Sequence, residues 1–442
     1  MRRQSLRRDQ RSLAVIIEGM NIIVWGINYS PELTGIAPYN TVLCEYLAAQ
    51  GHAVQMVTSF SYYPEWHKRQ EDRGRWFRLD RLNGVIVHRC WHYVPARPST
   101  FRRILHELSF VATTFLRVLT LRKTDVMVVV SPPLLLGFAA WLAGLFIRAP
   151  FIFHVQDMQP DAALKMGMVH GGPLMRLLYF LEAFSYRKAA RVSGISEGML
   201  TAFKNKEVPP GKLILFPNGV ILPNLSELPP AGRFRHRMAF APEVFLAVYS
   251  GNLGVKHGIE ILLETARLLQ GQNFRIVICG DGARRALLAE QIKTFRLENV
   301  FLIPLQPEVE YLEMMVDTDL YLVTQQAGSG SLFFPSKLLK GLAMAKAVAV
   351  VADDESELAR SAREGQFAVT VPPNQPGKLA AQLEILAKNP ARLQALGDAG
   401  RKYVEQFELN RLLLAFETDL RFLTARPRPK LGPRPEVDAI SQ

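Results

Sequence analysis

Short apolar runs alternate with amphipathic helical stretches along most of this chain. The first apolar runs lie at 21–25, 53–58 and 85–89, and apolar positions recur at helical spacing over 41–50. Further strands are predicted at 125–130, 151–154, 191–193 and 213–216. Further helices are predicted at 101–122, 134–147, 173–189 and 196–204. This alternation, with nearly continuous apolar strands, predicts a parallel sheet covered by helices on both faces.

The alternation stops at 217–220 and resumes at 244. Residues 221–243 are rich in proline and glutamate and are predicted to be a linker. Later strands are predicted at 274–279, 300–303, 320–323, 348–352 and 368–371. We therefore predict an α/β protein with two doubly wound, Rossmann-like domains, at 20–220 and 244–400. Ligands of such sheets bind beyond the carboxyl ends of the strands, so two facing domains predict a cleft.

Both ends of the chain lie outside these two runs. Residues 1–19 are arginine-rich without a long apolar core, which predicts a basic extension rather than a signal peptide. Residues 401–425 predict an amphipathic C-terminal helix that could cross back to the first domain. Residues 426–442 are rich in proline and predict a disordered tail.

Composition narrows the compartment and the kind of partner. Hydrophobic residues make up 49% of the 442 residues, and the formal net charge is +13. A basic protein favours anionic partners such as nucleotides, nucleic acid or a membrane surface. The three cysteines show no disulfide or metal spacing, which indicates a reducing cytosol. Nucleic acid is not favoured, because the basic residues do not gather with aromatic residues into a stacking platform.

The turn after the strand that begins at 244 carries the clearest candidate chemistry. Gly251, Asn252 and Lys256 lie between this strand and a helix whose apolar positions begin at Ile259. Glycines let the backbone approach a ligand, and a helix N-terminus with a lysine suits an anion such as a diphosphate. The spacing matches neither the dinucleotide fingerprint nor the P-loop.

The second domain repeats this pattern. Gly280 ends a strand in a glycine turn, and Ser336 and Lys337 follow a proline at the start of a predicted helix. A lysine is unfavourable in the first helical turn unless an anion binds nearby. We therefore predict that Ser336 and Lys337 face the cleft and the same anion.

Two stretches of the first domain favour contact with a membrane. The helix at 101–119 is apolar on one side, while its other side carries Arg102, Arg103 and Arg117. This is typical of a helix lying in a membrane interface. The uncharged run at 134–147 is too short to span a bilayer. Ordinary packing of both helices on a sheet is the alternative.

Six motifs occur together in a characteristic order. They are NYSPELTGIAPYN, FHVQD, PNGV, SGNLGVKHGIEILLE, GDG and PSKLLKGLAMAKAVAV. In this order the chain resembles the retaining GT-B glycosyltransferases, and more narrowly the bacterial exopolysaccharide, colanic-acid and O-antigen glycosyltransferases. The resemblance covers about residues 20–425. It implies a nucleotide-sugar donor on the second domain, an acceptor on the first, retention of anomeric configuration, and no metal or other cofactor.

The resemblance also implies roles for single residues. Gly35 and Lys256 would lie near the donor diphosphate, and His154 near the donor sugar. From its position three residues further on, and not from the resemblance, Asp157 is expected to orient His154. The chain departs from the family where Asn252 replaces a common arginine. It departs again where Leu332 and Lys340 replace two glutamates, the second of which usually holds the donor ribose.

These observations predict a metal-independent glycosyltransferase of the hexosyl or N-acetylhexosaminyl type. It would act on a lipid-linked saccharide in cell-surface polysaccharide biosynthesis, in the cytoplasm and peripherally on the inner face of an anionic cell membrane. Asp317 and Asp319 match a metal-binding Asp-x-Asp pattern but are better interpreted as a helix-to-strand turn. A sugar-nucleotide epimerase of the same fold and a catalytically inactive sugar-nucleotide-binding subunit are the alternatives.

Overall fold

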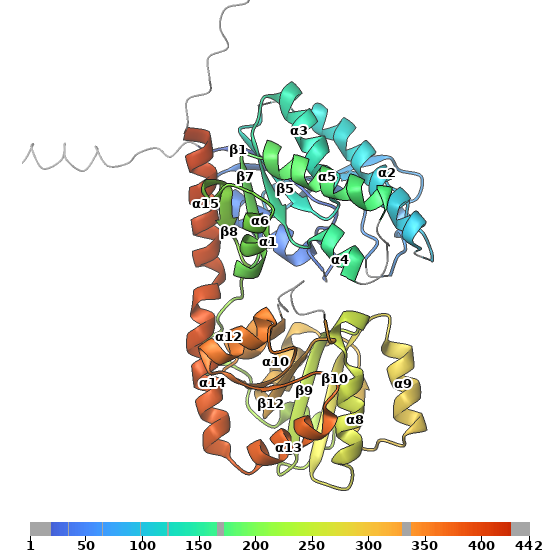
Figure 1. The fold of residues 1–442 in the computed structure, drawn as a ribbon, viewed down its shortest axis with the longest axis vertical. Helices are drawn as coiled ribbons and strands as arrows, with labels where there is room; N and C mark the ends of the chain where they lie inside the picture. Colours follow the sequence, from blue (N-terminus) through green and yellow to red (C-terminus); the bar gives the residue numbers. More distant parts are fainter. Residues whose placement is uncertain are drawn as a thin grey trace, which may run out of the picture.

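The computed structural model contains two α/β domains joined by two crossings of the chain (Figure 1). It describes residues 19–33, 35–63, 65–97, 99–121, 123–165, 172–328 and 337–425. The predicted class, α/β with two doubly wound Rossmann-like domains, is confirmed. Residues 1–18 of the predicted extension and the predicted tail at 426–442 lie outside the described residues.

The first domain is built on an eight-stranded sheet in the order β3-β4-β2-β1-β5-β6-β7-β8. Its strands are β1 (Asn21–Trp25), β2 (Ala53–Ser59), β3 (Phe77–Leu82), β4 (Val85–Cys90), β5 (Val126–Ser131), β6 (Phe151–Val155), β7 (Arg191–Gly194) and β8 (Leu213–Leu215). All neighbours pair in parallel except β3, which is antiparallel to β4. Strand β3 is not among the predicted strands, because it is an edge strand with exposed apolar residues and carries no continuous apolar run.

Helices cover both faces of this sheet. They are α1 (Ala37–Ala49), α2 (Thr100–Leu119), α3 (Leu136–Ile147), α4 (Gln159–Lys165), α5 (Pro173–Lys188) and α6 (Glu197–Asn205). One apolar core lies beneath α2, α3, α5 and α6, and a second lies on the α1 side. Because β5 and β6 are buried on both faces, their residues are apolar without alternation.

The second domain has a six-stranded parallel sheet in the order β11-β10-β9-β12-β13-β14. Its strands are β9 (Phe245–Asn252), β10 (Phe274–Asp281), β11 (Val300–Ile303), β12 (Leu320–Thr324), β13 (Ala347–Val351) and β14 (Ala368–Val371). Its helices are α8 (Glu260–Leu268), α9 (Arg285–Thr294), α10 (Glu308–Asp317), α11 (Lys337–Ala343), α12 (Glu357–Gly365), α13 (Pro376–Ala387) and α14 (Pro390–Val404).

The segment predicted as a linker is partly helical. It contains α7 (Arg233–Arg237), which packs on α10. The Asp317 carboxylate accepts hydrogen bonds from the backbone N–H groups of Gly232 and Arg235 at the start of α7. Asp319 pairs with the Arg235 side chain at 2.7 Å. The Asp-x-Asp pattern therefore fastens this segment to the second domain, a structural use that agrees with its interpretation as a turn.

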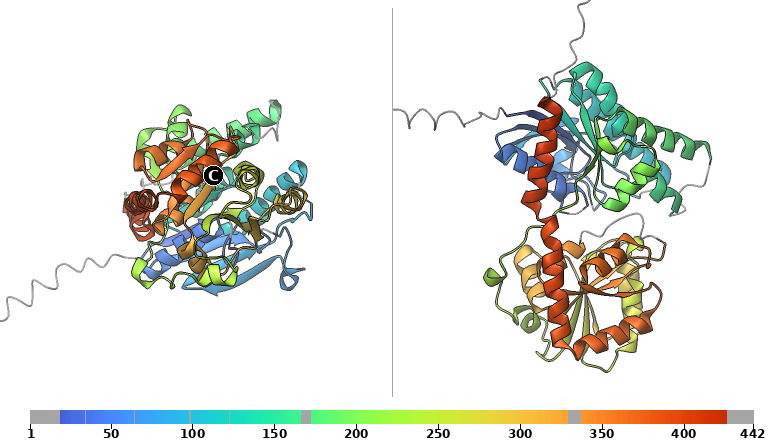
Figure 2. Two further views of the ribbon diagram at one scale, coloured as in Figure 1. Left: turned by 90° about the horizontal axis from the view of Figure 1, so that it is seen from below. Right: turned by 60° about the vertical axis from the view of Figure 1, so that its left-hand side comes forward.

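The chain returns to the first domain near its end. The helix predicted at 401–425 is interrupted by a 3₁₀ turn at Glu405–Phe407, and α15 (Leu409–Ala425) then packs beside α1. The two crossings run side by side, because Val220 forms a parallel bridge with Glu408. Figure 2 shows α14 and α15 running along one side of both domains. Phe416 of α15 stacks on Phe216 of the first domain, with ring centres 4.2 Å apart.

Candidate active site

Residues that follow the carboxyl ends of strands in the two domains lie opposite one another. Asn252, at the end of β9, forms a side-chain hydrogen bond with Tyr63, which follows β2. Lys256, in the turn after β9, acts electrostatically on Asp157, which follows β6. Both pairs span the two domains, so the carboxyl edges of the two sheets bring predicted residues of both domains together.

Two lysines converge on the second-domain side. Lys337 is the first residue of α11, and its Nζ donates a hydrogen bond to the Tyr249 hydroxyl. The same nitrogen lies 3.5 Å from Nδ1 of His257. His257 belongs to the short 3₁₀ turn Val255–His257, which also carries Lys256. The predicted pair of lysines is therefore gathered around one buried histidine and one buried tyrosine.

The electrostatics of this cluster favour an anionic ligand. Burial lowers the pKa of Lys337 well below its usual value, and the charge of Lys256 lowers it further. Burial, followed by Lys337 and Lys256, lowers the pKa of His257 to about 2. A bound anion would stabilise the protonated lysines and so oppose these effects. The cluster therefore has the character of a site for phosphate groups.

Two glycines give the second-domain turns their close packing. Gly280 of β10 lies in register with Gly251 of β9, and a Cβ on Gly280 would come within 2.0 Å of the Gly251 carbonyl oxygen. Gly258 has φ +55°, and a Cβ there would meet the backbone of Gln326 at 3.1 Å. The absence of a side chain at Gly280 thus allows the ends of β9 and β10 to lie close together. Gly251 lies against the side chain of Lys337.

On the first-domain side, a buried carboxylate shapes the loops. Glu32 accepts hydrogen bonds from the backbone N–H groups of Tyr62 and Tyr63 at 2.8 and 2.9 Å, and from the Asn28 amide at 2.7 Å. Gly35 follows in the same loop and packs against the Tyr63 ring. Glu32 therefore places Gly35 and Tyr63 together at the edge that faces Asn252.

His154 is buried, and its hydrogen-bond partners differ from the expected one. The imidazole is buried between β6 and α15, close to the rings of Phe216 and Phe416. Its Nδ1 bonds Ser193 Oγ at 3.0 Å, and its Nε2 bonds Gln156 Nε2 at 2.8 Å. Both ring nitrogens are thus occupied without Asp157, so the expected orientation of His154 by Asp157 is wrong.

The reason is the alternation of side chains along a strand. His154 points to the face covered by α15, whereas Asp157 lies beyond the end of β6, where the chain has left the sheet. Burial raises the pKa of Asp157, while the charge of Lys256 opposes that rise. Gln156 connects the two regions, since its amide bonds His154 and also exchanges two hydrogen bonds with the Asn218 amide.

The first domain holds a second carboxyl group near this edge. Glu107 of α2 accepts a hydrogen bond from the Gln159 amide at 3.0 Å, and Gln159 begins α4 directly after the β6 turn. Burial raises the pKa of Glu107 to about 7, although the Gln159 bond and Arg103 lower it. This group was not singled out from the sequence, because a lone glutamate in an amphipathic helix carries no distinctive signal.

Several other participants could not be read from the chain alone. Tyr63, Tyr249 and His257 lie in or beside predicted motifs, but only the fold brings their rings to the lysines and to Asn252. Ser336, predicted beside Lys337, lies outside the described residues. Among the residues that the structure describes, no group of three or more His, Cys, Asp or Glu side chains could hold a metal ion.

Two facing Rossmann-like domains, with two lysines gathered at the carboxyl edge of the second, are the arrangement of the GT-B glycosyltransferases. The chain matches the glycosyl transferase 4-like domain over residues 34–219 and the glycosyl transferases group 1 family over residues 233–403. It is 32% identical over 360 residues to the putative colanic acid biosynthesis glycosyl transferase WcaI of Escherichia coli (strain K12), covering 80% of this chain and 87% of that protein. The protein therefore belongs to this glycosyltransferase family.

Solved structures agree on the fold. Sucrose-phosphate synthase from Thermosynechococcus elongatus superimposes with a TM-score of 0.72 at 17% identity, over 92% of this chain and 100% of that one. Anabaena Alr3699/HepE in complex with UDP-glucose superimposes with a TM-score of 0.67 at 15% identity, over 91% of this chain and 100% of that one. At these identities the likeness concerns the fold alone.

Proposed function

We propose that the protein is a retaining glycosyltransferase that moves a hexosyl or N-acetylhexosaminyl group from a nucleotide-diphosphate sugar to a saccharide acceptor. The observation that carries this proposal is the convergence of Lys256 and Lys337 at the carboxyl edge of the second sheet. Anabaena Alr3699/HepE, which shares the fold, is known in complex with UDP-glucose, and the relative WcaI is named for colanic acid biosynthesis. Both support a nucleotide-sugar donor and a role in cell-surface polysaccharide formation.

In the proposed reaction the leaving diphosphate gains negative charge as the sugar departs. Lys256 and Lys337 stabilise that charge in a partly dehydrated site, where electrostatic stabilisation is strong. Gly251 and Asn252 form the wall beside the diphosphate, and Gly280 supports that wall. Gly35 and Tyr63 close over the donor from the first domain. The acceptor attacks from the face that the leaving group occupies, which retains the configuration.

Asp157 is the proposed first-domain residue nearest the donor sugar. It faces Lys256, so a diphosphate that attracts Lys256 leaves the Asp157 carboxylate available for a sugar hydroxyl. His154 is buried away from this position, and we propose that it acts by positioning Gln156 and therefore the turn that carries Asp157. Because two lysines neutralise the diphosphate in this mechanism, we propose that no metal ion is required.

The acceptor side of the proposal is a lipid-linked saccharide at the cytoplasmic face of the cell membrane. The first domain exposes apolar residues on α2, which a protein that meets lipid would need. No helix in the part of the chain that the structure describes is long and apolar enough to span a bilayer. We therefore propose peripheral contact with the membrane through the first domain.

A donor panel tests the proposed function. Specific binding of one nucleotide sugar raises the melting temperature by mass action, so UDP-, GDP- and CMP-sugars are compared in thermal-shift measurements. The stabilising donor is then incubated with the enzyme, its hydrolysis is measured, and the anomer released first is identified by proton NMR. Binding without hydrolysis would favour an inactive subunit, and an inverted anomer would exclude retention.

A further inference from the structure

Helix α2 packs on the sheet through Phe110, Val111 and Val118, and through polar residues that bond the chain beside them. Thr113 Oγ1 donates to the Trp91 carbonyl at 2.6 Å, and His106 Nδ1 bonds the Tyr93 carbonyl at 2.7 Å. Arg117 bonds Nδ1 of His88 on β4 at 2.9 Å, so it is not one of the freely solvated arginines. Further apolar residues of α2 face outward, with Leu116 61% exposed.

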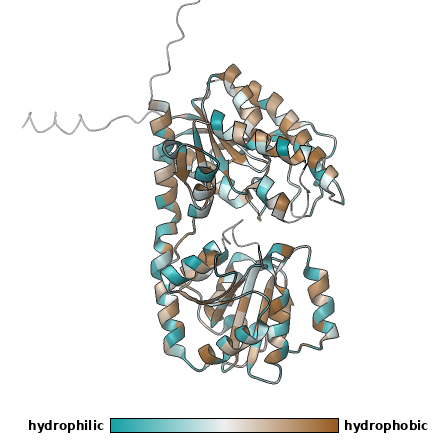
Figure 3. Cartoon of the chain, viewed as in Figure 1, coloured by the Kyte–Doolittle hydropathy of each residue, from teal (hydrophilic) through white to brown (hydrophobic). Residues whose placement is uncertain are grey.

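The neighbouring helices continue this outward apolar surface. Helix α3 packs between α2 and α5, so the three helices form one layer over the sheet, here named the three-helix layer (Figure 1). Figure 3 shows hydrophobic residues along these helices. The exposed large apolar residues of the layer are Phe101, Ile104, Leu105, Leu108 and Leu116 on α2, Leu145 and Phe146 on α3, and Leu174, Leu177 and Phe180 on α5.

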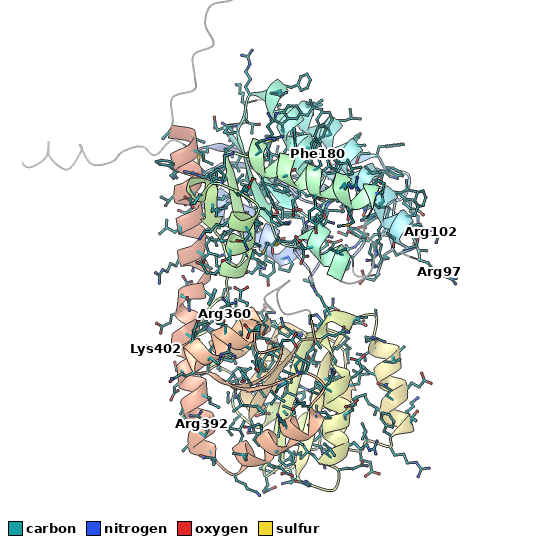
Figure 4. The ribbon with its side chains drawn as sticks, in the orientation of Figure 1. Arg97, Arg102, Phe180, Arg360, Arg392 and Lys402 are labelled. Carbon is teal, nitrogen blue, oxygen red and sulfur yellow. The ribbon has the colours of Figure 1, made fainter. Side chains whose placement is uncertain are left out.

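The charges around this surface have one sign. The exposed charged residues of α2 and α5, with the residue that ends α3, are Arg102, Arg103, Arg148, Arg176, Arg187 and Lys188. The two acidic residues of these fully described helices are turned inward: Glu107 bonds Gln159, and Glu182 is buried and pairs with Lys206. Figure 4 shows Arg97 and Arg102 at one end of the layer and Phe180 on its outer side.

We infer that the outer face of the three-helix layer is the surface on which the protein docks to an anionic lipid bilayer. This inference rests on the proposed membrane contact and deepens it, because it adds α3 and α5 to a contact expected from α2. Exposed apolar side chains insert between lipid headgroups, and the surrounding cations are attracted to anionic headgroups. An apolar area rimmed by charged residues is typical of a surface with a partner.

The charges also distinguish a bilayer from a second copy of the chain. A two-fold symmetric dimer through this layer would bring the same patch of each copy together. The exposed arginines and lysines of both copies would then face one another without exposed acids from these helices. An anionic bilayer instead supplies the opposite charge over the whole face.

The docked orientation would place the acceptor route beside the cleft. Leu164 of α4 is exposed, and α4 begins with Gln159, which bonds Glu107 of α2. The apolar surface therefore continues toward the edge where Asp157 and Tyr63 meet the second domain. A saccharide attached to a membrane lipid could enter at this edge while its lipid stays in the bilayer.

Vesicle sedimentation tests the docking surface. The protein is mixed with phosphatidylcholine vesicles that contain or lack phosphatidylglycerol. One double variant alters α2 (Leu108→Ser with Leu116→Ser), and another alters α5 (Leu177→Ser with Phe180→Ser). Each removed side chain should weaken binding about tenfold, since partial insertion of one such residue contributes on the order of 1.4 kcal/mol. Binding should also require the anionic lipid and decline with added salt.

A matched control uses exposed apolar residues of the second domain, Leu268→Ser with Ile385→Ser, which should sediment like wild type. Circular dichroism melting checks that every variant is folded, and stabilisation by the donor is measured without vesicles. Loss of binding in the α2 variant alone would overturn the three-helix surface while leaving a contact through α2. Absence of sedimentation in wild type would overturn membrane docking but not sugar transfer, which the donor panel measures separately. Equal loss in the control variant would show that the binding is not specific to this face.

Discussion

Replacing Lys337 by alanine should weaken nucleotide-diphosphate binding and change its dependence on pH. Lys337 is half-buried at the start of α11, where its nitrogen contacts Tyr249 and His257. A hydrogen bond to a charged group contributes about 1.5–3 kcal/mol, which corresponds to roughly a tenfold to 150-fold loss of affinity. Lys256→Ala should have an effect of similar size, because its turn approaches the same anion.

The depressed pKa of Lys337 adds a signature that simple loss of a contact would not produce. In the free protein, burial and Lys256 favour the neutral amine. A bound diphosphate favours the ammonium form, so the pKa rises on binding. At any pH between the free and bound pKa values, binding therefore takes up a proton. Affinity should fall as the pH rises through this interval.

Calorimetry measures both effects. The stabilising nucleotide is titrated in two buffers of different ionisation enthalpy, and the difference in heat gives the number of protons taken up. Wild type should take up as much as about one proton. Lys337→Arg should bind without this uptake, because a guanidinium remains protonated. Lys293→Ala, an exposed lysine on α9, serves as the control. Unchanged affinity in Lys337→Ala, together with equal heats in both buffers, would refute the assignment.

Three further predictions follow from the same contacts. Asp157→Asn should lower donor hydrolysis at least tenfold. Nucleotide affinity, measured by calorimetry, should stay equal or rise slightly, because a negative charge beside Lys256 is removed. Unchanged hydrolysis would exclude a role of Asp157 in catalysis. Hydrolysis should survive EDTA, and its loss with rescue by Mn²⁺ would contradict metal independence. Burial lowers the pKa of His154 to about 4 from 6.5. The folded protein therefore favours the neutral imidazole. This preference contributes on the order of 3 kcal/mol to the free energy of unfolding above pH 6.5, and the contribution is lost as the pH falls toward 4. Denaturant unfolding of His154→Gln should show a correspondingly shallower acid dependence.

The sequence alone determined the class of fold, and it singled out the two lysine-bearing turns of the second domain. Apolar runs separated by helical repeats are local patterns, and they require parallel sheets whose two faces are covered. The glycine turn with Lys256 and the helix start with Lys337 each predicted an anionic ligand independently of the other. The family resemblance implied that Gly35, His154 and Lys256 lie near one donor. These predictions depend on neighbours in the chain, so they needed no tertiary contact.

The tertiary structure decided which groups meet and which way each helix faces. Periodicity identified α2 as amphipathic, but it could not show that Thr113, His106 and Arg117 turn inward to bond the chain around β4 while Leu108 and Leu116 stay exposed. His154 was assigned to the cleft, yet strand alternation turned it toward α15, a helix that returns from the other end of the sequence. An amphipathic helix or a strand residue has two possible sides, and only the partner that packs against it selects one.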